Sequence, residues 1–379
     1  MIVKVLFWIS ALSVIYAYIG YPLVLVILGW FRRENKVQLS EEYTPSLSII
    51  IPAYNEEGVI GQKLKNTLEL IYPQKKLEII IVSDGSIDKT KQIVQSFLPN
   101  QKIKFIEVSQ RKGKSNALNL GLDHASGEII VFSDSSILLE PNALLEIVKG
   151  FQDEKIGCIS GEDHIPGNGG EGLYGKYELF LRNKESRIGS IVGASGSFYA
   201  QRKELCMPFV EGLAPDFLSV LNTIEQGYRA ISEPKAKGMM SSADETEAEF
   251  RRKVRTLLRG MTTLWFKRNL ISPFNYGMFA FFLLSHKLVR WLVPSFLIVL
   301  LVTNMFLLSI FIYQIIFLGQ FIFYIFGFMA WWKIINMDKK IIGKIPLYFS
   351  MTNIAILQAW ILFINGTRQE IWEPTRRNS

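Results

Sequence analysis

Residues 127–136 read Gly-Glu-Ile-Ile-Val-Phe-Ser-Asp-Ser-Ser, an unbroken apolar run that ends in a polar tip at Asp134. A run without polar alternation predicts a strand that is buried on both faces, as in the middle of a parallel sheet. Ligands of open α/β sheets bind outside the carboxyl ends of such strands, where a carboxylate can hold a divalent cation. Asp134 alone leaves two interpretations open: a ligand residue, or an acid that caps the next helix.

The region around this run alternates predicted strands with predicted helices. Further buried strands are expected at residues 46–52, 77–82 and 103–108. Helices with apolar residues at helical spacing are expected at residues 58–71, 89–98 and 112–125. This alternation predicts an α/β domain with a mainly parallel, doubly wound sheet.

Three of these strands end in acidic loops, which contain Glu56, Asp84 and Asp134. Because parallel strands have their carboxyl ends at one edge of the sheet, the loops should form one ligand site. The first strand is not followed by Gly-x-Gly-x-x-Gly, and the chain has no Walker-type phosphate loop. These absences argue against a dinucleotide-dependent oxidoreductase and a P-loop nucleotidase.

The composition indicates a membrane protein more than a nucleic-acid-binding protein. Of 379 residues, 49% are hydrophobic, and 42 Lys and Arg against 34 Asp and Glu give a net charge of +8. Apolar residues gather at the two ends, so we expect the positive charge to face anionic lipid and phosphate-bearing substrates, with no nucleic-acid partner. Cys158 and Cys206 form no metal pattern or disulfide framework, which fits a reducing compartment.

The N-terminal segment predicts a membrane anchor at residues 1–31. Residues 5–30 carry no charge, and a bilayer needs about 20 such residues. A secretory signal peptide is the competing interpretation, although its apolar core is normally about 7–15 residues. Arg32, Arg33 and Lys36 follow at once, so the positive-inside rule places the next domain in the cytoplasm. A helix interruption is expected around residues 20–22, Gly-Tyr-Pro.

The C-terminal third predicts further membrane segments of a multi-pass cell-membrane protein. Residues 261–291 mix phenylalanines with His286, Lys287 and Arg290, which favours an interfacial amphipathic segment. Membrane helices are expected within residues 292–366, at 292–311, 315–332 and 345–364, before a basic tail at 367–379. The lysines between the second and third helices and the tail arginines both favour the cytoplasm, so the side of the C-terminus stays open.

Four motifs make the prediction for the central region specific. They are Ile-Pro-Ala-Tyr-Asn-Glu-Glu at 51–57, Ser-Asp-Gly-Ser-Ile-Asp at 83–88, Gly-Lys-Ser-Asn-Ala-Leu-Asn at 113–119 and Phe-Ser-Asp at 132–134. In this order they resemble the family 2 glycosyltransferases, which have the GT-A fold. The resemblance covers residues 46–260, and the flanking segments are similar to those of membrane-bound polysaccharide synthases.

The resemblance implies a nucleotide-sugar site in the loops after the strands. The implied residues are Pro52, Tyr54, Glu56, Asp84, Lys114 and Asp134. Chemically, Asp84 can accept the imide N–H of uracil and Tyr54 can stack on the base. Asp134 is also the implied ligand of a divalent cation, Mg²⁺ or Mn²⁺. Tyr54 as an ordinary loop aromatic and Lys114 as a solvated helix lysine are the alternatives.

The resemblance also implies an acceptor side. Residues 193–200 resemble a small-residue strand beside the acceptor, with Gly193, Ser195 and Gly196 as acceptor-side residues; tight strand packing is the alternative. Asp216 matches the family's acidic motif and is the implied catalytic base, with a helix N-cap as the alternative.

Two departures from the family pattern concern the same site. Ser136 stands where the usual Asp-x-Asp metal motif has its second acid, and serine is a poor ligand for a hard cation. The Gln-x-x-Arg-Trp motif of processive synthases is absent from the basic helix expected at 250–260, although Arg252 and Arg255 remain. That helix is expected to face either the diphosphate or the membrane.

The resemblance therefore predicts a membrane-bound inverting glycosyltransferase of hexosyl or N-acetylhexosaminyl type. Its partners would be a nucleotide-sugar donor (a UDP-sugar), a polysaccharide or lipid-linked glycan acceptor, membrane lipids, and glycan-export or assembly subunits. The alternative, which Ser136 favours, is a non-catalytic transferase-fold subunit of a glycan assembly complex.

Overall fold

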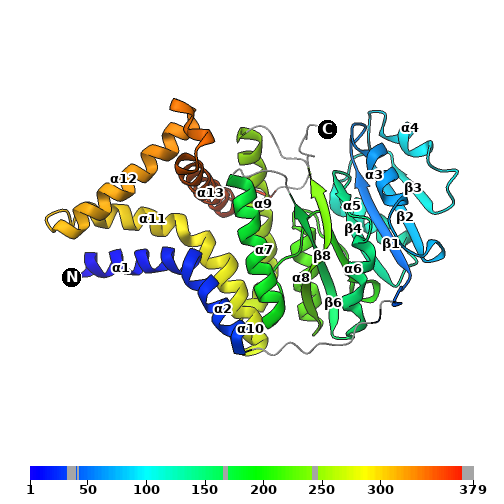
Figure 1. Cartoon of the computed structure of the whole chain (residues 1–379), viewed down its shortest axis with the longest axis horizontal. Coiled ribbons are helices and arrows are strands. Elements are labelled where there is room, and N and C mark those ends of the chain that lie inside the picture. The colour runs from blue at the N-terminus through cyan, green and yellow to red at the C-terminus, as the bar shows by residue number, and fades with distance from the viewer. Residues whose placement is uncertain (32–39, 41, 165–169, 241–245, 369–379) are drawn as a thin grey trace.

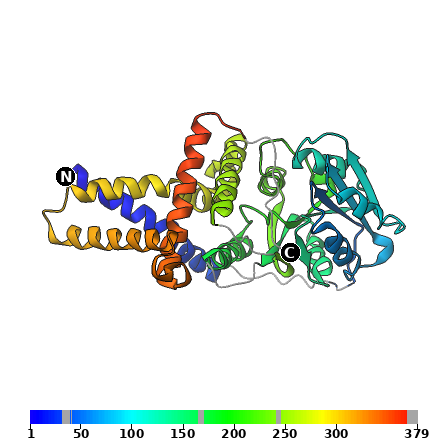
Figure 2. The same ribbon diagram turned by 90° about the horizontal axis from the view of Figure 1, so that it is seen from above.

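The computed structural model describes residues 1–31, 40, 42–164, 170–240 and 246–368. An α/β domain lies at one end of the long axis and the apolar helices lie at the other (Figures 1 and 2). The strands are β1 (Leu47–Ala53), β2 (Leu77–Asp84), β3 (Ile103–Val108), β4 (Ile129–Ser133), β5 (Ile137–Leu139), β6 (Ile156–His164), β7 (Phe198–Arg202) and β8 (Arg229–Met240). The helices of this domain are α3 (Ile60–Leu68), α4 (Thr90–Gln95), α5 (Lys114–His124), α6 (Ala143–Lys149), α7 (Gly170–Ile188), α8 (Pro215–Glu225) and α9 (Thr246–Phe266).

The described strands form one mixed sheet in the order β3-β2-β1-β4-β7-β6-β8-β5. The first four are parallel, whereas β7 runs antiparallel to both of its neighbours, β4 and β6. The carboxyl ends of β1, β2 and β4 therefore share one edge, as the strand pattern predicted. The expected α/β class is confirmed, and the antiparallel β7 is an addition that the alternation of elements does not show.

Both faces of the sheet are covered, which explains why its strands lack polar alternation. On β1, Ile50 packs into one apolar cluster while Ile49 and Ile51 pack into another. The cluster that contains Ile50 also contains Tyr21 of the N-terminal segment and Ile356 of the C-terminal one. The α/β domain and the apolar helices thus share one continuous core.

Within the described residues, four helical segments are long and apolar enough to cross a membrane: Ile2–Phe31, Pro273–Met305, Phe311–Trp331 and Ile341–Ile364. The first joins α1 (Ile2–Ile15) to α2 (Tyr21–Phe31) through a π-helical turn, Tyr16–Gly20, next to the predicted interruption. The others contain α10 (Pro273–Leu283), α11 (Arg290–Met305), α12 (Phe311–Trp331) and α13 (Ile341–Ile364).

The helix bounds differ from the predicted division into an interfacial segment at 261–291 and membrane helices from 292. Residues 261–266 belong to α9, and α10, a π-helical turn (Leu284–Val289) and α11 form one helical segment from 273 to 305. The charges of this segment face protein: His286 and Arg290 bind glutamates of α7. Pairing offsets the cost of burying these charges, so they do not require water.

Other predicted segments differ or fall outside the described residues. Residues 193–197 are not a strand, since β7 begins only at Phe198. Arg32, Arg33 and Lys36, on which the orientation prediction rests, lie outside the described residues, as does the predicted tail from residue 369 onward.

Candidate active site

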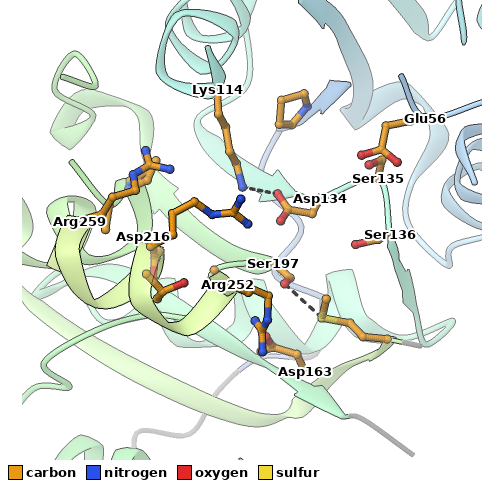
Figure 3. A pocket seen from close by; sticks show the side chains of 17 residues that line it. Glu56, Lys114, Asp134, Ser135, Ser136, Asp163, Ser197, Asp216, Arg252 and Arg259 are labelled. Atoms are coloured by element: carbon orange, nitrogen blue, oxygen red, sulfur yellow. Dashed lines mark hydrogen bonds and ion pairs between the residues drawn. The ribbon is translucent and has the colours of Figure 1, made fainter. Parts of the chain in front are cut away.

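A pocket of about 300 Å³ opens at the carboxyl edge of the sheet, and we name it the Asp134 pocket (Figure 3). Pro52 lies near the end of β1, and Glu56 lies in the loop after it. Asp134 and Ser136 come from the tip that joins β4 to β5. Asp216, in the first turn of α8, closes the opposite wall. The structure therefore brings Pro52 and Asp216, which are 164 positions apart in the sequence, into one pocket.

Lys114 and Asp134 form the central ion pair of this pocket, with 2.5 Å between Nζ and Oδ1. Lys114 is the first residue of α5 and follows Gly113, whose φ is +98°. The positive φ favours glycine here, and a Cβ at this position would also lie 2.7 Å from a carboxylate oxygen of Glu211, which would have to move. This turn points Lys114 into the pocket, and the solvated-lysine alternative is wrong.

Asp84 supports that turn and does not line the Asp134 pocket. It is only 4% exposed, and its two carboxylate oxygens accept hydrogen bonds from the backbone N–H groups of Lys112 and Gly113, at 2.9 and 2.7 Å. Tyr54 is also absent from the pocket wall, and its ring lies 3.9 Å below the guanidinium of Arg111. Contacts of these two residues with a nucleotide stay a prediction.

Lys63 is a residue of this site that sequence reasoning missed. It lies on α3 and is fully buried, and its Nζ donates to Ser133 Oγ at 2.7 Å and to the Ile137 carbonyl at 2.8 Å. These two acceptors flank the tip that carries Asp134. Burial lowers the pKa of Lys63 to about 7, although the Asp134 carboxylate opposes this change. The only sequence signal was a lysine among the apolar positions of an amphipathic helix.

Glu56 lies across the pocket from Asp216 (Figure 3). Burial raises its pKa to about 7; a hydrogen bond from Ser135 opposes the rise, and the Asp134 carboxylate adds to it. Near neutral pH, Glu56 therefore exchanges a proton and can donate a hydrogen bond as an acid.

Asp216 is not the N-cap of its helix. The N-cap of α8 is Ala214, which makes no side-chain capping hydrogen bond, and Pro215 occupies the first turn with Asp216. Burial raises the pKa of Asp216, against the lowering effect of Lys114, Lys287 and other cations around it. A carboxylate with a raised pKa at the wall of a pocket has the properties of a general base.

The basic helix α9 forms the remaining wall of the pocket through Arg252, Arg255 and Arg259. Arg259 also donates to the Leu213 carbonyl from Nε at 3.1 Å and from Nη2 at 2.6 Å, which ties α9 to the loop before Asp216. Arg252 pairs with Glu249 at 2.7 Å. The sequence left open whether α9 faces the diphosphate or the membrane. In the structure its arginines line the Asp134 pocket, and the helix also packs on α13.

The three predicted acceptor-side residues separate in the structure. Gly196 lines the Asp134 pocket, where a Cβ would lie 3.8 Å from Asp216 Oδ2. Gly193 lines a second cavity of about 270 Å³, which we name the Lys287 cavity. Ser195 is buried, and its hydroxyl accepts the backbone N–H groups of Ser197 and Phe198 at 3.2 and 3.1 Å. Ser195 thus shapes the loop, and it lines neither the Asp134 pocket nor the Lys287 cavity.

The donor set of the pocket fits a cation that is held largely by substrate. No cluster of three or more His, Cys, Asp or Glu among the described residues could hold a metal ion. Asp134 supplies a carboxylate, and Ser136 supplies only a hydroxyl on the same wall. Mg²⁺ is often bound by one or two carboxylates together with water and substrate phosphates. Asp134 would be that carboxylate here, with one oxygen shared with Lys114.

Comparisons with known proteins agree with the α/β fold. The chain resembles a mannosyltransferase of Pyrobaculum calidifontis, solved in complex with GDP-Man and Mn²⁺, with a TM-score of 0.73 at 21% identity over 94% of this chain and 99% of the other. That likeness defines the fold as GT-A. Residues 48–206 match the model of glycosyl transferase family 2. The chain therefore contains a family 2 glycosyltransferase domain.

Two curated relatives are named poly-beta-1,6-N-acetyl-D-glucosamine synthase. The Staphylococcus epidermidis protein is 29% identical over 182 residues, which are 46% of this chain and 43% of that protein. The Staphylococcus aureus protein is 24% identical over 286 residues, 70% of this chain and 68% of that protein. The chain thus spans less than half of the first relative.

Proposed function

We propose that this chain is a membrane-bound inverting glycosyltransferase that moves a hexosyl or N-acetylhexosaminyl group from a UDP-sugar to a polysaccharide or lipid-linked glycan. The observation that carries the proposal is the Asp134 pocket. It sets an ion-paired Lys114 and Asp134 opposite Asp216, with the arginines of α9 beside them. The relatives that make poly-N-acetylglucosamine support the sugar type.

The residues divide the chemistry between the two walls. The Asp216 carboxylate takes the proton of the acceptor hydroxyl while that oxygen attacks the anomeric carbon. Lys114, Arg252 and Arg255 oppose the negative charge that collects on the departing diphosphate. A divalent cation on Asp134, when bound, would neutralise more of that charge. A single displacement inverts the anomeric centre, and product anomers resolved by NMR test this directly.

The sharpest test of the activity is a donor screen on the full chain, purified in detergent. We expect one sugar class among UDP- and GDP-sugars to be consumed, with a requirement for Mg²⁺ or Mn²⁺ that a chelator removes. Retention of the donor's anomeric configuration would refute the inverting mechanism.

The alternative is a non-catalytic subunit of a glycan assembly complex, and Ser136 in the metal tip favours it. A subunit of this kind would bind a nucleotide-sugar without consuming it. Donor binding without hydrolysis or transfer, across all donors and acceptors tried, would select this alternative. Glycan-export or assembly subunits that co-purify with the chain would support it further.

A further inference from the structure

The Lys287 cavity lies on the membrane side of Asp216. Its walls come from α7, α8, α9, α13 and the π-helical turn Leu284–Val289. Ala214, Asp216, Arg252 and Thr256 line both this cavity and the Asp134 pocket. The proposed base therefore stands where the two spaces meet, and a molecule in the Lys287 cavity can present an atom to Asp216.

Most charges in this cavity already have partners. Glu178 pairs with Arg290 at 2.5 Å and with His286 at 3.0 Å. Glu185 binds the other ring nitrogen of His286 at 2.6 Å and accepts the Tyr21 hydroxyl at 2.5 Å. These contacts lock α7 to the segment 273–305 and to the N-terminal helix. They engage both carboxylate oxygens of Glu178 and one of Glu185; among the described residues, Glu185 Oε2 has no hydrogen-bond partner.

Lys287 is different from its neighbours His286 and Arg290. Among the described residues it makes no hydrogen bond or ion pair, and its Nζ lies 5.7 Å from the centre of the Phe217 ring. The position of a Cβ on Gly193 would be 3.8 Å from this Nζ, so glycine leaves space in front of the ammonium. An ammonium group in such surroundings is stabilised by an anion.

Part of this cavity is lined by apolar side chains. Val192, Leu257, Trp291 and Ile356 line it, and Ile356 belongs to the membrane-spanning helix α13. Val192, Trp291 and Ile356 are part of the core that the α/β domain shares with these helices. A ligand that fills this space needs an anionic group near Lys287 and an apolar chain toward α13.

We propose that the Lys287 cavity is the acceptor site and that the acceptor is a phosphate-bearing lipid. Its phosphate binds Lys287, its apolar chain extends toward α11 and α13, and a hydroxyl of its head group reaches Asp216. This inference rests on the proposed transferase function. The acceptor O–H proton passes to the Asp216 carboxylate as the O–C bond to the sugar forms. The bond from the sugar to the nucleoside diphosphate breaks, and the diphosphate leaves with the electron pair.

The experiment uses the full chain in a maltoside detergent, which carries no phosphate group. Radiolabelled phosphatidylglycerol, a polyisoprenyl diphosphate sugar and neutral diacylglycerol are added separately, and binding and sugar transfer are both measured. Wild-type protein should bind at least one phosphate lipid about 10- to 100-fold more tightly than diacylglycerol, as expected for a hydrogen bond between charged groups. The lipid that also receives sugar identifies the source of the phosphate.

Three variants assign the effect to the side chain. Lys287→Met should remove the preference for phosphate, while Lys287→Arg should keep it. Lys340→Met removes an exposed lysine at the start of α13, outside the cavity, and should behave as wild type. Donor affinity, which should be unchanged in all three, reports that each variant is folded.

Equal binding of phosphate and neutral lipids by wild type would overturn the inference, even if Lys287→Met failed to fold. An unchanged phosphate preference in a folded Lys287→Met would do the same. Sugar transfer to neutral acceptors that does not depend on phosphate would refute the phosphate-lipid acceptor and would support the proposed transferase function. Phosphate-dependent lipid binding with no turnover of any donor would defeat the function while keeping the lipid site.

Discussion

Replacing Asp216 with asparagine separates a catalytic base from a structural acid. Asparagine keeps the shape of the side chain but cannot accept the acceptor's proton, and general-base catalysis contributes roughly 10²- to 10⁴-fold. The fold should tolerate the change. Losing a negative charge in the first turn of α8 costs about 0.3–1 kcal/mol of stability. Removing a buried carboxylate also removes its desolvation cost, which offsets this loss. Turnover should therefore fall 100- to 10,000-fold while the free energy of unfolding changes by about 1 kcal/mol or less.

The assay measures donor affinity and transfer rate on the same purified preparation of Asp216→Asn. Donor affinity should be nearly unchanged, because the proposed base acts on the acceptor and not on the donor. Since burial raises the pKa of Asp216, the acid limb of the wild-type rate should lie above the ordinary range of an aspartate and should be absent in the variant. Asp123→Asn, at an exposed position of α5, is the matched control. Wild-type turnover in Asp216→Asn would remove this residue from the mechanism, and a parallel loss of donor affinity would assign it to the nucleotide site.

Asp134→Ala should abolish transfer in a protein that remains folded. Ser136→Asp should lower the metal concentration for half-maximal activity, because it adds a hard oxygen ligand. Metal titrations that show no change in either variant would contradict the assignment. Glu56→Gln removes a carboxyl whose pKa is about 7 in the folded protein and near 4.3 when unfolded, so wild type loses stability through this group as pH rises across that window. At pH 8 the variant should be more stable than wild type by up to about 3 kcal/mol, since each pKa unit corresponds to 1.36 kcal/mol. If Glu56→Gln changed the melting temperature equally at pH 5 and pH 8, the raised pKa would be refuted. Lys63→Met should lower the free energy of unfolding by about 1–3 kcal/mol, because it leaves the Ile137 carbonyl unpaired. It should also reduce turnover more than donor affinity. A change in stability with no change in turnover would mean that Lys63 has a structural role only. Protease added to intact cells should leave the chain uncut at Lys112 if the α/β domain is cytoplasmic, and cleavage there would reverse the orientation.

Local sequence determined the identity of most elements around the site. The apolar runs at β1, β2 and β4 are visible because both faces of those strands are buried, and each ends in the polar loop that the parallel arrangement brings to one edge. The apolar segments near the two ends of the sequence likewise predict helices that can cross a membrane. These features depend on neighbours in the chain, so periodicity and run length reveal them.

Tertiary structure decided what each polar residue contacts. The sequence did not show that both oxygens of Asp84 hold the turn before Lys114 or that Lys63 supports the Asp134 tip. His286, Lys287 and Arg290 appeared interfacial because the glutamates that pair with two of them lie about 100 residues away on α7. Whether a charge meets water, a partner or an empty cavity depends on the packing of segments distant in sequence. No local pattern records that packing, and so the meeting of two cavities at Asp216 is visible only in the folded chain.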